Sequence, residues 1–252
     1  MSDAGRVLAL AGTELRLVLR NKTVAVSSIV VPLAVGVFWA FSFGASTQPG
    51  MTAMAVALQL SIVLAMGIYV TATQTVVGRR HNRVLKRLRT SGISDTGLLV
   101  ATVAPAVVIG LVQLGIFGII HAVIGSPWPV DPFPLVLALL GGLALVVTAA
   151  LATTVVTPSP ERSQITTLPL TFLLLAAAAA LAVVPSQGWW QALVAVPGAP
   201  IGRLTQLAYE GGTWAAGPVG LPALLPAVAA LLVWPVVFGY LAARRFRWDP
   251  RH

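Results

Sequence analysis

Long apolar stretches dominate the chain, and short polar stretches separate them. A helix crosses the hydrocarbon core of a membrane in about 20 apolar residues, and six stretches come close to or exceed that length. They do not alternate polar with apolar residues, as the strands of a transmembrane barrel would. The pattern therefore predicts an all-α membrane protein with six transmembrane helices, at about Val24–Phe43, Ala53–Val77, Leu98–Ile124, Leu135–Thr157, Thr167–Val184 and Leu221–Ala243.

The composition agrees with this interpretation. Of the 252 residues, 57% are hydrophobic and only 9% are charged, whereas about a quarter of the residues in soluble domains are charged. The mean hydropathy is +0.90. So few charges cannot cover a soluble protein of this length, which excludes a soluble enzyme and a disordered chain. The absence of cysteine excludes a disulfide-stabilised secreted domain. We expect a single transmembrane domain over residues 1–252.

The basic residues predict the orientation in the membrane. The net charge is +9, and 15 of the 16 Lys and Arg residues lie before the first span, in residues 78–97, in residues 158–166 or after the last span. These are alternate gaps, and the other gaps contain only Arg203. The positive-inside rule therefore places both termini and both loops in the cytoplasm. The charges report topology and contact with membrane lipids, and we expect no nucleic acid among the partners.

Residues 5–22 combine apolar and basic positions at helical spacing. This pattern predicts an amphipathic helix in the inner membrane interface, with arginine side chains reaching lipid phosphates. The alternative is an ordinary positive flank that only sets orientation. The apolar face contains Val7, Leu8, Ala11, Leu15, Val18 and Leu19, and Arg6, Thr13, Arg16 and Arg20 lie largely off it.

The segment GRRHNRVLKRLRTSGISD, within residues 78–97, contains six positive charges. Leu85 and Leu88 lie three apart, so a short helix would project both from one face. Gly92 is suited to a left-handed helix end. One interpretation is that the segment binds anionic lipid headgroups. The other is that it docks on an acidic protein surface, with the leucines as apolar contacts. The basic residues around the leucines are Arg83, Lys86, Arg87 and Arg89.

Residues 185–220 form the longest predicted connection, on the outer side, and they are too apolar for a disordered loop. We expect two short helices that re-enter the outer leaflet and narrow the exit, the second over Ile201–Glu210 and ended by Gly211 and Gly212. Arg203 and Glu210 are seven apart and share a helix face. The alternative for this pair is a surface ion pair of little energetic weight. The candidate residues of this outer gate are Trp189, Trp190, Arg203 and Glu210.

Signatures of catalysis are missing from the sequence. There is no GxxxxGK[ST] loop, no HExxH and no GxSxG, and the three histidines are scattered. We therefore expect no metal site, no bound cofactor and no ATPase site in this chain. The spans contain no Asp, Glu, Lys or Arg before the end of the last one, which argues against a proton-driven transporter. The energy for any transport must come from elsewhere.

Mildly polar side chains occur in several spans. A sparse polar lining with Met and aromatic residues would suit an amphiphilic or lipophilic substrate. The alternative is hydrogen bonding between helices, which such residues make routinely. The candidates for a substrate pathway are Gln59, Met66, Tyr69, Thr73 and Thr171.

Together these features resemble the ABC-2 type transporter permeases, the membrane subunits of bacterial exporters of drugs, polysaccharides and lipids. The resemblance covers the whole chain and is strongest in RRHNRVLKRLRTSGIS. Leu85 to Ser94 match a family stretch between spans two and three, with Gly92 where Pro is common. The basic run Arg79–Arg80–His81 stands where an acidic residue often precedes this stretch, and Ala stands where Ser-Gly is often found near the end of span five.

The resemblance implies an assignment for each cytoplasmic segment. Residues 78–97 would contain the coupling helix that docks on an ATPase subunit, so docking is favoured over lipid binding. Glu161 and Arg162, within SPERSQ, would form a smaller second contact. Residues 185–210 would be the family's outer re-entrant helices.

We therefore expect the permease subunit of a drug-resistance-type exporter in the bacterial cell membrane. Two copies of a separate ABC ATPase would bind ATP and Mg, and a second permease subunit, identical or related, would complete the pathway, lined by spans one, two and five. Drugs or antibiotics are the first expected substrates, and lipids or glycolipids the second. The rivals are a non-transporting membrane anchor or assembly protein and, less favoured, a lipid-modifying enzyme.

Overall fold

The computed structural model describes residues 3–20, 26–48, 50–88, 92–184, 189–216 and 220–246. Every named element in these residues is helical, and one isolated bridge joins Ala216 to Pro222. The elements are α1 (Asp3–Arg20), η1 (Val26–Val30), α3 (Val31–Phe43), α4 (Met51–Ile62), η2 (Val63–Val70), α5 (Thr71–His81), α6 (Val84–Leu88), α7 (Asp95–Val123), α8 (Phe133–Val156), α9 (Pro160–Val183), η4 (Trp189–Ala195), α10 (Ala199–Glu210) and α11 (Leu224–Arg245).

Five helices are long and apolar enough to cross a membrane. They correspond to the second to sixth predicted spans, and the all-helical prediction is confirmed. The first predicted span is represented by the shorter apolar helix Ser28–Phe43. Residues 21–25, where that span was expected to begin, lie outside the described residues. The five are Met51–His81, Asp95–Val123, Phe133–Val156, Pro160–Val183 and Leu224–Arg245.

Two helices extend further than the predicted spans at the basic end of the bundle. The helix of the second predicted span continues past Val77, through the basic residues, to His81. The fifth begins at Pro160, so most of the predicted loop 158–166 is helix. Pro160 occupies the first turn, where a missing N–H costs nothing, and Ser159 before it is extended. Charged residues that looked like loop therefore belong to helices.

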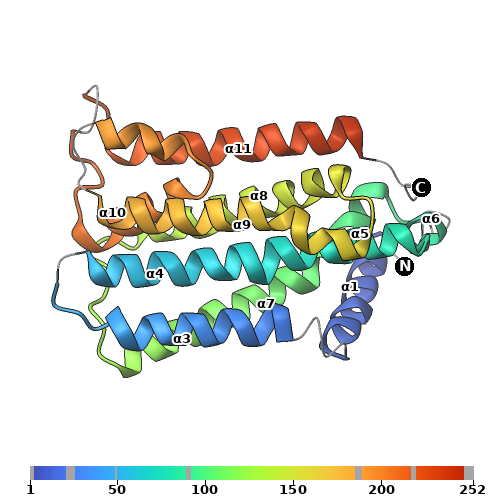
Figure 1. The fold of residues 1–252 in the computed structure, drawn as a ribbon, viewed down its shortest axis with the longest axis horizontal. Coiled ribbons are helices and arrows are strands. Elements are labelled where there is room, and N and C mark those ends of the chain that lie inside the picture. The colour runs from blue at the N-terminus through green and yellow to red at the C-terminus, as the bar shows by residue number, and fades with distance from the viewer. Residues whose placement is uncertain are drawn as a thin grey trace.

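The helices are arranged so that the two ends of the bundle differ (Figure 1). Helices α3, α4, α9 and α11 run side by side along the long axis. Helix α1 lies steeply across one end, near α5 and α6, and α1 packs along α7. Helix α10 lies at the opposite end, where it contacts α4, α8, α9 and α11.

Two short helices, η4 and α10, lie between α9 and α11, and their re-entry into the outer leaflet stays a prediction. Helix α10 packs very closely on α9 through Gly198 and Gly202, a pair with the spacing of small residues at membrane helix contacts. A Cβ atom on Gly202 would lie 1.9 Å from the Ala178 carbonyl oxygen, and one on Gly198 would lie 2.6 Å from the Leu174 backbone. The alanine-rich stretch of α9 therefore serves close packing.

A glutamine side chain supports the π-helical segment η1. The side-chain amide of Gln113 on α7 donates to the carbonyls of Ser28 (2.9 Å) and Ile29 (3.2 Å). π-helical segments displace carbonyls from the regular α-helical bonds, and a bonded side chain compensates for this in an apolar environment. Gln113 thus joins α7 to the start of the first predicted span.

Candidate functional site

The basic segment between the second and third predicted spans folds into a corner and a short helix. The N–H of Arg83 donates to the Arg80 carbonyl (3.0 Å), and Arg83 has a φ of 57°, which non-glycine residues rarely adopt. The Arg83 carbonyl then accepts from the N–H of Arg87 (3.2 Å), at the start of α6. The chain therefore turns sharply between α5 and α6.

Helix α6 presses its most apolar position into the bundle. Leu85 is fully buried and belongs to the main apolar core, whereas Leu88 is half-buried. The prediction that Leu85 projects outward as a docking contact is wrong, because this helix of one turn lies against the bundle and Leu85 fills the core. Arg83, which directly precedes α6, and Arg87 on α6 are both exposed. Arg89 and the Lys86 side chain lie outside the described residues.

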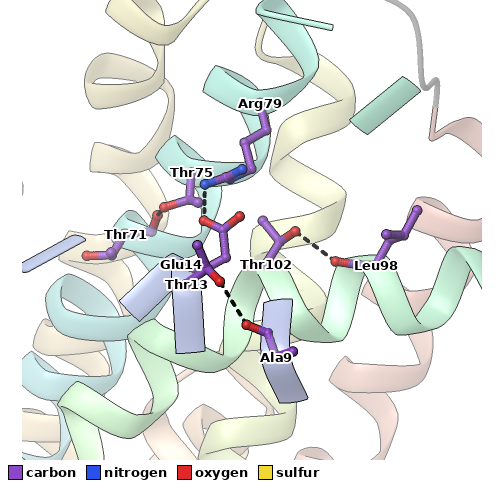
Figure 2. Close-up of polar contacts among 8 residues, drawn as sticks. All are labelled: Ala9, Thr13, Glu14, Thr71, Thr75, Arg79, Leu98 and Thr102. Carbon is purple, nitrogen blue, oxygen red and sulfur yellow. Dashed lines mark hydrogen bonds and ion pairs between the residues drawn. The ribbon is translucent and has the colours of Figure 1, made fainter. Parts of the chain in front are cut away.

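Helix α1 joins this corner through an ion pair (Figure 2). The Arg79 guanidinium, at the end of α5, donates to the Glu14 carboxylate on α1. The Glu14 side chain is 3% exposed and that of Arg79 is 17% exposed. A charge buried this far is tolerated in a fold because it is paired, and removing one partner leaves the other uncompensated. Within the predicted helix of residues 5–22, the structure has α1 up to Arg20, and residues 21–22 lie outside the described residues. One face of α1 is buried through Glu14, and its place in the membrane interface stays a prediction.

Helix α1 also reaches the chain beyond α6. The Arg6 guanidinium donates to the Gly92 carbonyl (3.4 Å), and a Cβ atom on Gly97 would lie 3.0 Å from the Val7 side chain. Gly92 has a φ of 76°, so the expected left-handed glycine is present. Helix α1 therefore contacts the chain on both sides of α6.

Arg80 ties the same corner to the end of α8. Its side chain is almost completely buried and donates to the carbonyls of Thr154 (2.8 Å) and Thr157 (2.5 Å). The last carbonyls of a helix have no partner within the helix, and a cation there also interacts favourably with the helix dipole. Two of the six charges in the basic segment, Arg79 and Arg80, thus hold the fold together and are unavailable to a partner.

The start of α9 lies at the same end of the bundle. Glu161 and Arg162 are both exposed in its first turn, and Glu161 is within electrostatic reach of His81. Both residues predicted to form a second contact are therefore accessible beside the α5–α6 corner. Arg80 holds the start of α9 near the end of α5, because its side chain donates to the Thr157 carbonyl in the short connection from α8 to α9.

Exposed Arg83, in the corner before α6, and exposed Arg87 on α6 can recognise an acidic protein surface. The sequence reasoning missed Glu14, although a signal was available. Glu14 is the single carboxylate in the basic helix of residues 5–22. A lone acid among arginines, spaced with the apolar face, could have indicated an inward-facing charge and a buried cationic partner.

Comparison with known families decides the identity of the chain. The family model described as ABC-2 family transporter protein matches residues 17–244. The chain belongs to the ABC-2 transporter family. The match runs from the last turn of α1 almost to the end of α11, so it includes the α5–α6 corner and α10. No curated protein gives a significant match.

Membership of the ABC-2 family makes this chain the membrane subunit of an ABC transporter, with several membrane-spanning helices. ABC-2 permeases have no ATPase site of their own and work with an ABC ATPase as partner. The exposed basic corner is accordingly a candidate contact with that ATPase.

Inside this ABC-2 permease, most of the predicted pathway residues use their polar groups within the chain. The Tyr69 hydroxyl is fully buried and lies 3.0 Å from the Thr153 hydroxyl. Thr73 donates to the Tyr69 carbonyl (2.8 Å) and Thr171 to the Thr167 carbonyl (2.9 Å). Helix–helix and local hydrogen bonding therefore explains these residues. Met66 is half-buried against a small apolar cluster.

Gln59 differs because it belongs to a polar chain at the other end of the permease. Its amide donates to the Gly36 carbonyl (2.8 Å), and its oxygen lies 2.7 Å from His121 Nε2. His121 Nδ1 lies 2.7 Å from the Ser126 hydroxyl. The chain of bonds joins α3, α4 and α7, and Gln59 and His121 also line the pocket described below.

The outer-gate residues Arg203 and Glu210 do not form a direct surface ion pair. Arg203 is 6% exposed and donates to the Gln206 side-chain oxygen (2.6 Å), and the Gln206 amide donates to Glu210 (2.9 Å). Gln206, which sequence reasoning missed, links the two charges along α10. The backbones of Trp189 and Trp190 lie in η4, and their side chains lie outside the described residues.

Proposed function

We propose that this chain is the permease half of an ATP-driven exporter. Two copies of the ABC ATPase, which bind ATP and Mg, would dock on α6 and on the first turn of α9. The observation that carries the proposal is the arrangement of α6 and the residue before it. Arg83 and Arg87 are exposed, whereas Leu85 is fully buried in the core. A site that transmits force must be exposed to its partner and attached firmly to its own fold, and α6 meets both requirements.

Movement of α6 has two routes into the permease. Through Arg79 it reaches Glu14 and α1, and through Arg80 it reaches the end of α8. Because both arginines belong to the helix that continues into η2 and α4, a displacement at the corner would move a span that crosses the whole bundle. This supports coupling of ATP hydrolysis to the second span.

The proposed topology has six spans in the bacterial cell membrane, with both termini, α6 and the start of α9 in the cytoplasm. Helix α1 would lie in the inner interface among lipid headgroups, and α10 with η4 would re-enter from the outer side. A second permease subunit would pack against this one to form the pathway. The substrate would be amphiphilic or lipophilic, with drugs or antibiotics first and lipids or glycolipids second.

A charge reversal on α6 tests the docking proposal. We expect Arg87→Glu to weaken binding of the cognate ATPase by about tenfold or more, equivalent to about 1.4 kcal/mol, because an exposed cation opposite an acidic surface is replaced by a repelling charge. The measurement is co-purification of the ATPase with the tagged permease from native membranes, together with ATP-dependent efflux from cells.

Arg245→Glu is the matched control. Arg245 is also exposed, at the cytoplasmic end proposed for α11, so this variant makes the same change in charge without touching α6. We expect Arg245→Glu to keep the ATPase and efflux. Equal effects of the two variants would point to lipid contact in place of docking. If the wild-type chain binds no ATPase at all, a membrane anchor or assembly protein becomes the better interpretation.

A further inference from the structure

A pocket of about 320 Å³ opens between α4, α7 and α8 at the end of the bundle opposite α6. This volume lies at the lower end of the range for small-molecule sites. The walls are mainly apolar, from residues such as Leu60, Phe117 and Leu139, and none of the described residues that line the pocket is Asp, Glu, Lys or Arg. All of its lining residues belong to one chain.

The polar side chains that line the pocket include Gln59, His121, Ser126 and Tyr209. The Gln59 amide donates to the Gly36 carbonyl, so its oxygen faces His121 as an acceptor. The neutral histidine ring must then donate from Nε2 and accept at Nδ1 from the Ser126 hydroxyl. Both ring nitrogens of His121 are therefore engaged in hydrogen bonds, to Gln59 and to Ser126. The Ser126 oxygen keeps lone pairs that can accept a hydrogen bond from a ligand.

Tyr209, on the last turn of α10, adds a free donor. In the part of the chain that the structure describes, its hydroxyl makes no hydrogen bond. Burial raises the pKa of this hydroxyl, so it remains protonated at physiological pH. The pocket therefore presents one hydroxyl donor and one hydroxyl acceptor beside an apolar chamber.

We propose that this pocket binds an uncharged amphiphile, with its aliphatic tail along Leu60, Phe117 and Leu139 and a hydroxyl or carbonyl head at Ser126 and Tyr209. A charged head would lose its hydration without meeting an opposite charge, which costs far more than one hydrogen bond returns. A purely apolar ligand would make no hydrogen bond to Ser126 or Tyr209. The inference does not depend on ATPase docking.

The absence of cysteine allows a direct test by thiol labelling. The permease carrying Ala122→Cys, on the pocket wall, is placed in phosphatidylcholine nanodiscs and labelled with a lipophilic maleimide, with and without dodecan-1-ol. We expect labelling to slow about tenfold when the alcohol is at about ten times its dissociation constant, because the unoccupied fraction sets the rate. The cationic analogue dodecyltrimethylammonium should protect far less.

Two variants of α7 separate pocket binding from general effects. Gly118 lines the pocket and Gly115 does not, yet a Cβ atom at either position would meet no atom within 4 Å. Gly118→Leu should fill the chamber and abolish protection, and Gly115→Leu should leave it intact. Leu also raises helix propensity at both positions, so neither change should unfold α7. Val112→Cys, exposed on α7 away from the pocket, reports any effect of the alcohol on the bilayer itself.

Two kinds of molecule could supply this ligand: a free amphiphile, or a neighbouring lipid whose chain enters the pocket. Protection that appears on adding dodecan-1-ol to the nanodiscs indicates a free amphiphile. Protection already present in the discs, and lost after delipidation, indicates a lipid. Either result supports the proposal that the pocket binds an uncharged amphiphile. Equal protection of Val112→Cys, unchanged protection in Gly118→Leu, or no protection under any condition would overturn the proposal.

Discussion

The buried arginines at the basic end of the bundle stabilise the fold and are not available to a partner. Arg79 is paired with Glu14, and Arg80 is bonded to the last carbonyls of α8. Both arginines come directly before the corner that positions α6, so their contacts set where exposed Arg83 and Arg87 lie. At the residue scale, the basic segment therefore contains two kinds of arginine: Arg79 and Arg80 are bonded within the fold, and Arg83 and Arg87 are exposed at its surface.

Removal of the Glu14 carboxylate tests this division. Glu14→Gln leaves the Arg79 charge buried without an opposite charge, and we expect a loss of about 3–5 kcal/mol in stability. The measurement is the midpoint of thermal unfolding in detergent. Arg16→Gln, on the exposed side of the same helix, is the control and should change the midpoint little. The double variant Glu14→Leu with Arg79→Met should recover most of the loss, because it removes both charges. If Glu14→Gln alone unfolded at the same midpoint temperature as the wild type, the ion pair between Glu14 and Arg79 would not be needed for stability.

The position of α10 depends on two glycines that allow it to touch the backbone of α9. Lipid competes with apolar side chains for the same surface, so helices in a membrane gain most from close backbone packing. Gly202 lies directly over Ala178, with no room for even one methyl group. At the element scale, this contact holds the outer helix against the bundle and, through Tyr209, closes one side of the pocket.

A single methyl group on α10 should displace the helix. We expect Gly202→Ala to lower stability by about 1–3 kcal/mol, because the added Cβ overlaps the Ala178 carbonyl. Gly78→Ala on α5 is the control, since a Cβ atom there would meet nothing within 4 Å. Thermal unfolding in detergent measures both. An unchanged midpoint for Gly202→Ala would mean that α10 packs more loosely on α9 than the structure has it.

The whole molecule has two chemically different ends. One contains α1, α6 and the start of α9 with the exposed arginines, and the other contains α10, the apolar pocket and few charges. This polarity matches the alternation of basic residues along the sequence. It supports a cytoplasmic basic end and an outer end that holds α10.

Reporter fusions test this orientation. Fusions after Asp131 and near Gly211 should report the outer side, and fusions near Arg89 and after His252 should report the cytoplasm, since arginine-rich gaps remain inside. Paired alkaline phosphatase and fluorescent protein reporters give opposite signals at each site and serve as mutual controls. A cytoplasmic result near Gly211 would rule out the six-span topology.

The sequence by itself determined that the chain is an all-helical membrane protein of the ABC-2 type, where most spans lie, and that a short helix follows the second span. These conclusions need only the length and polarity of each stretch, and a resemblance carried by consecutive residues. Two short helices before the last span were also predictable, because apolar residues combined with Pro and Gly exclude both a span and a solvated loop.

Only the tertiary structure decided which side of each helix faces protein. The spans are apolar on every side, and lipid and protein interior favour the same residues, so periodicity does not distinguish them. For the same reason the sequence could not show that Leu85 is core, that Gly202 meets Ala178, or that Gln59 pairs with His121. Charges in a basic run likewise look alike until a partner from a distant segment, such as Glu14 for Arg79, places one of them inside.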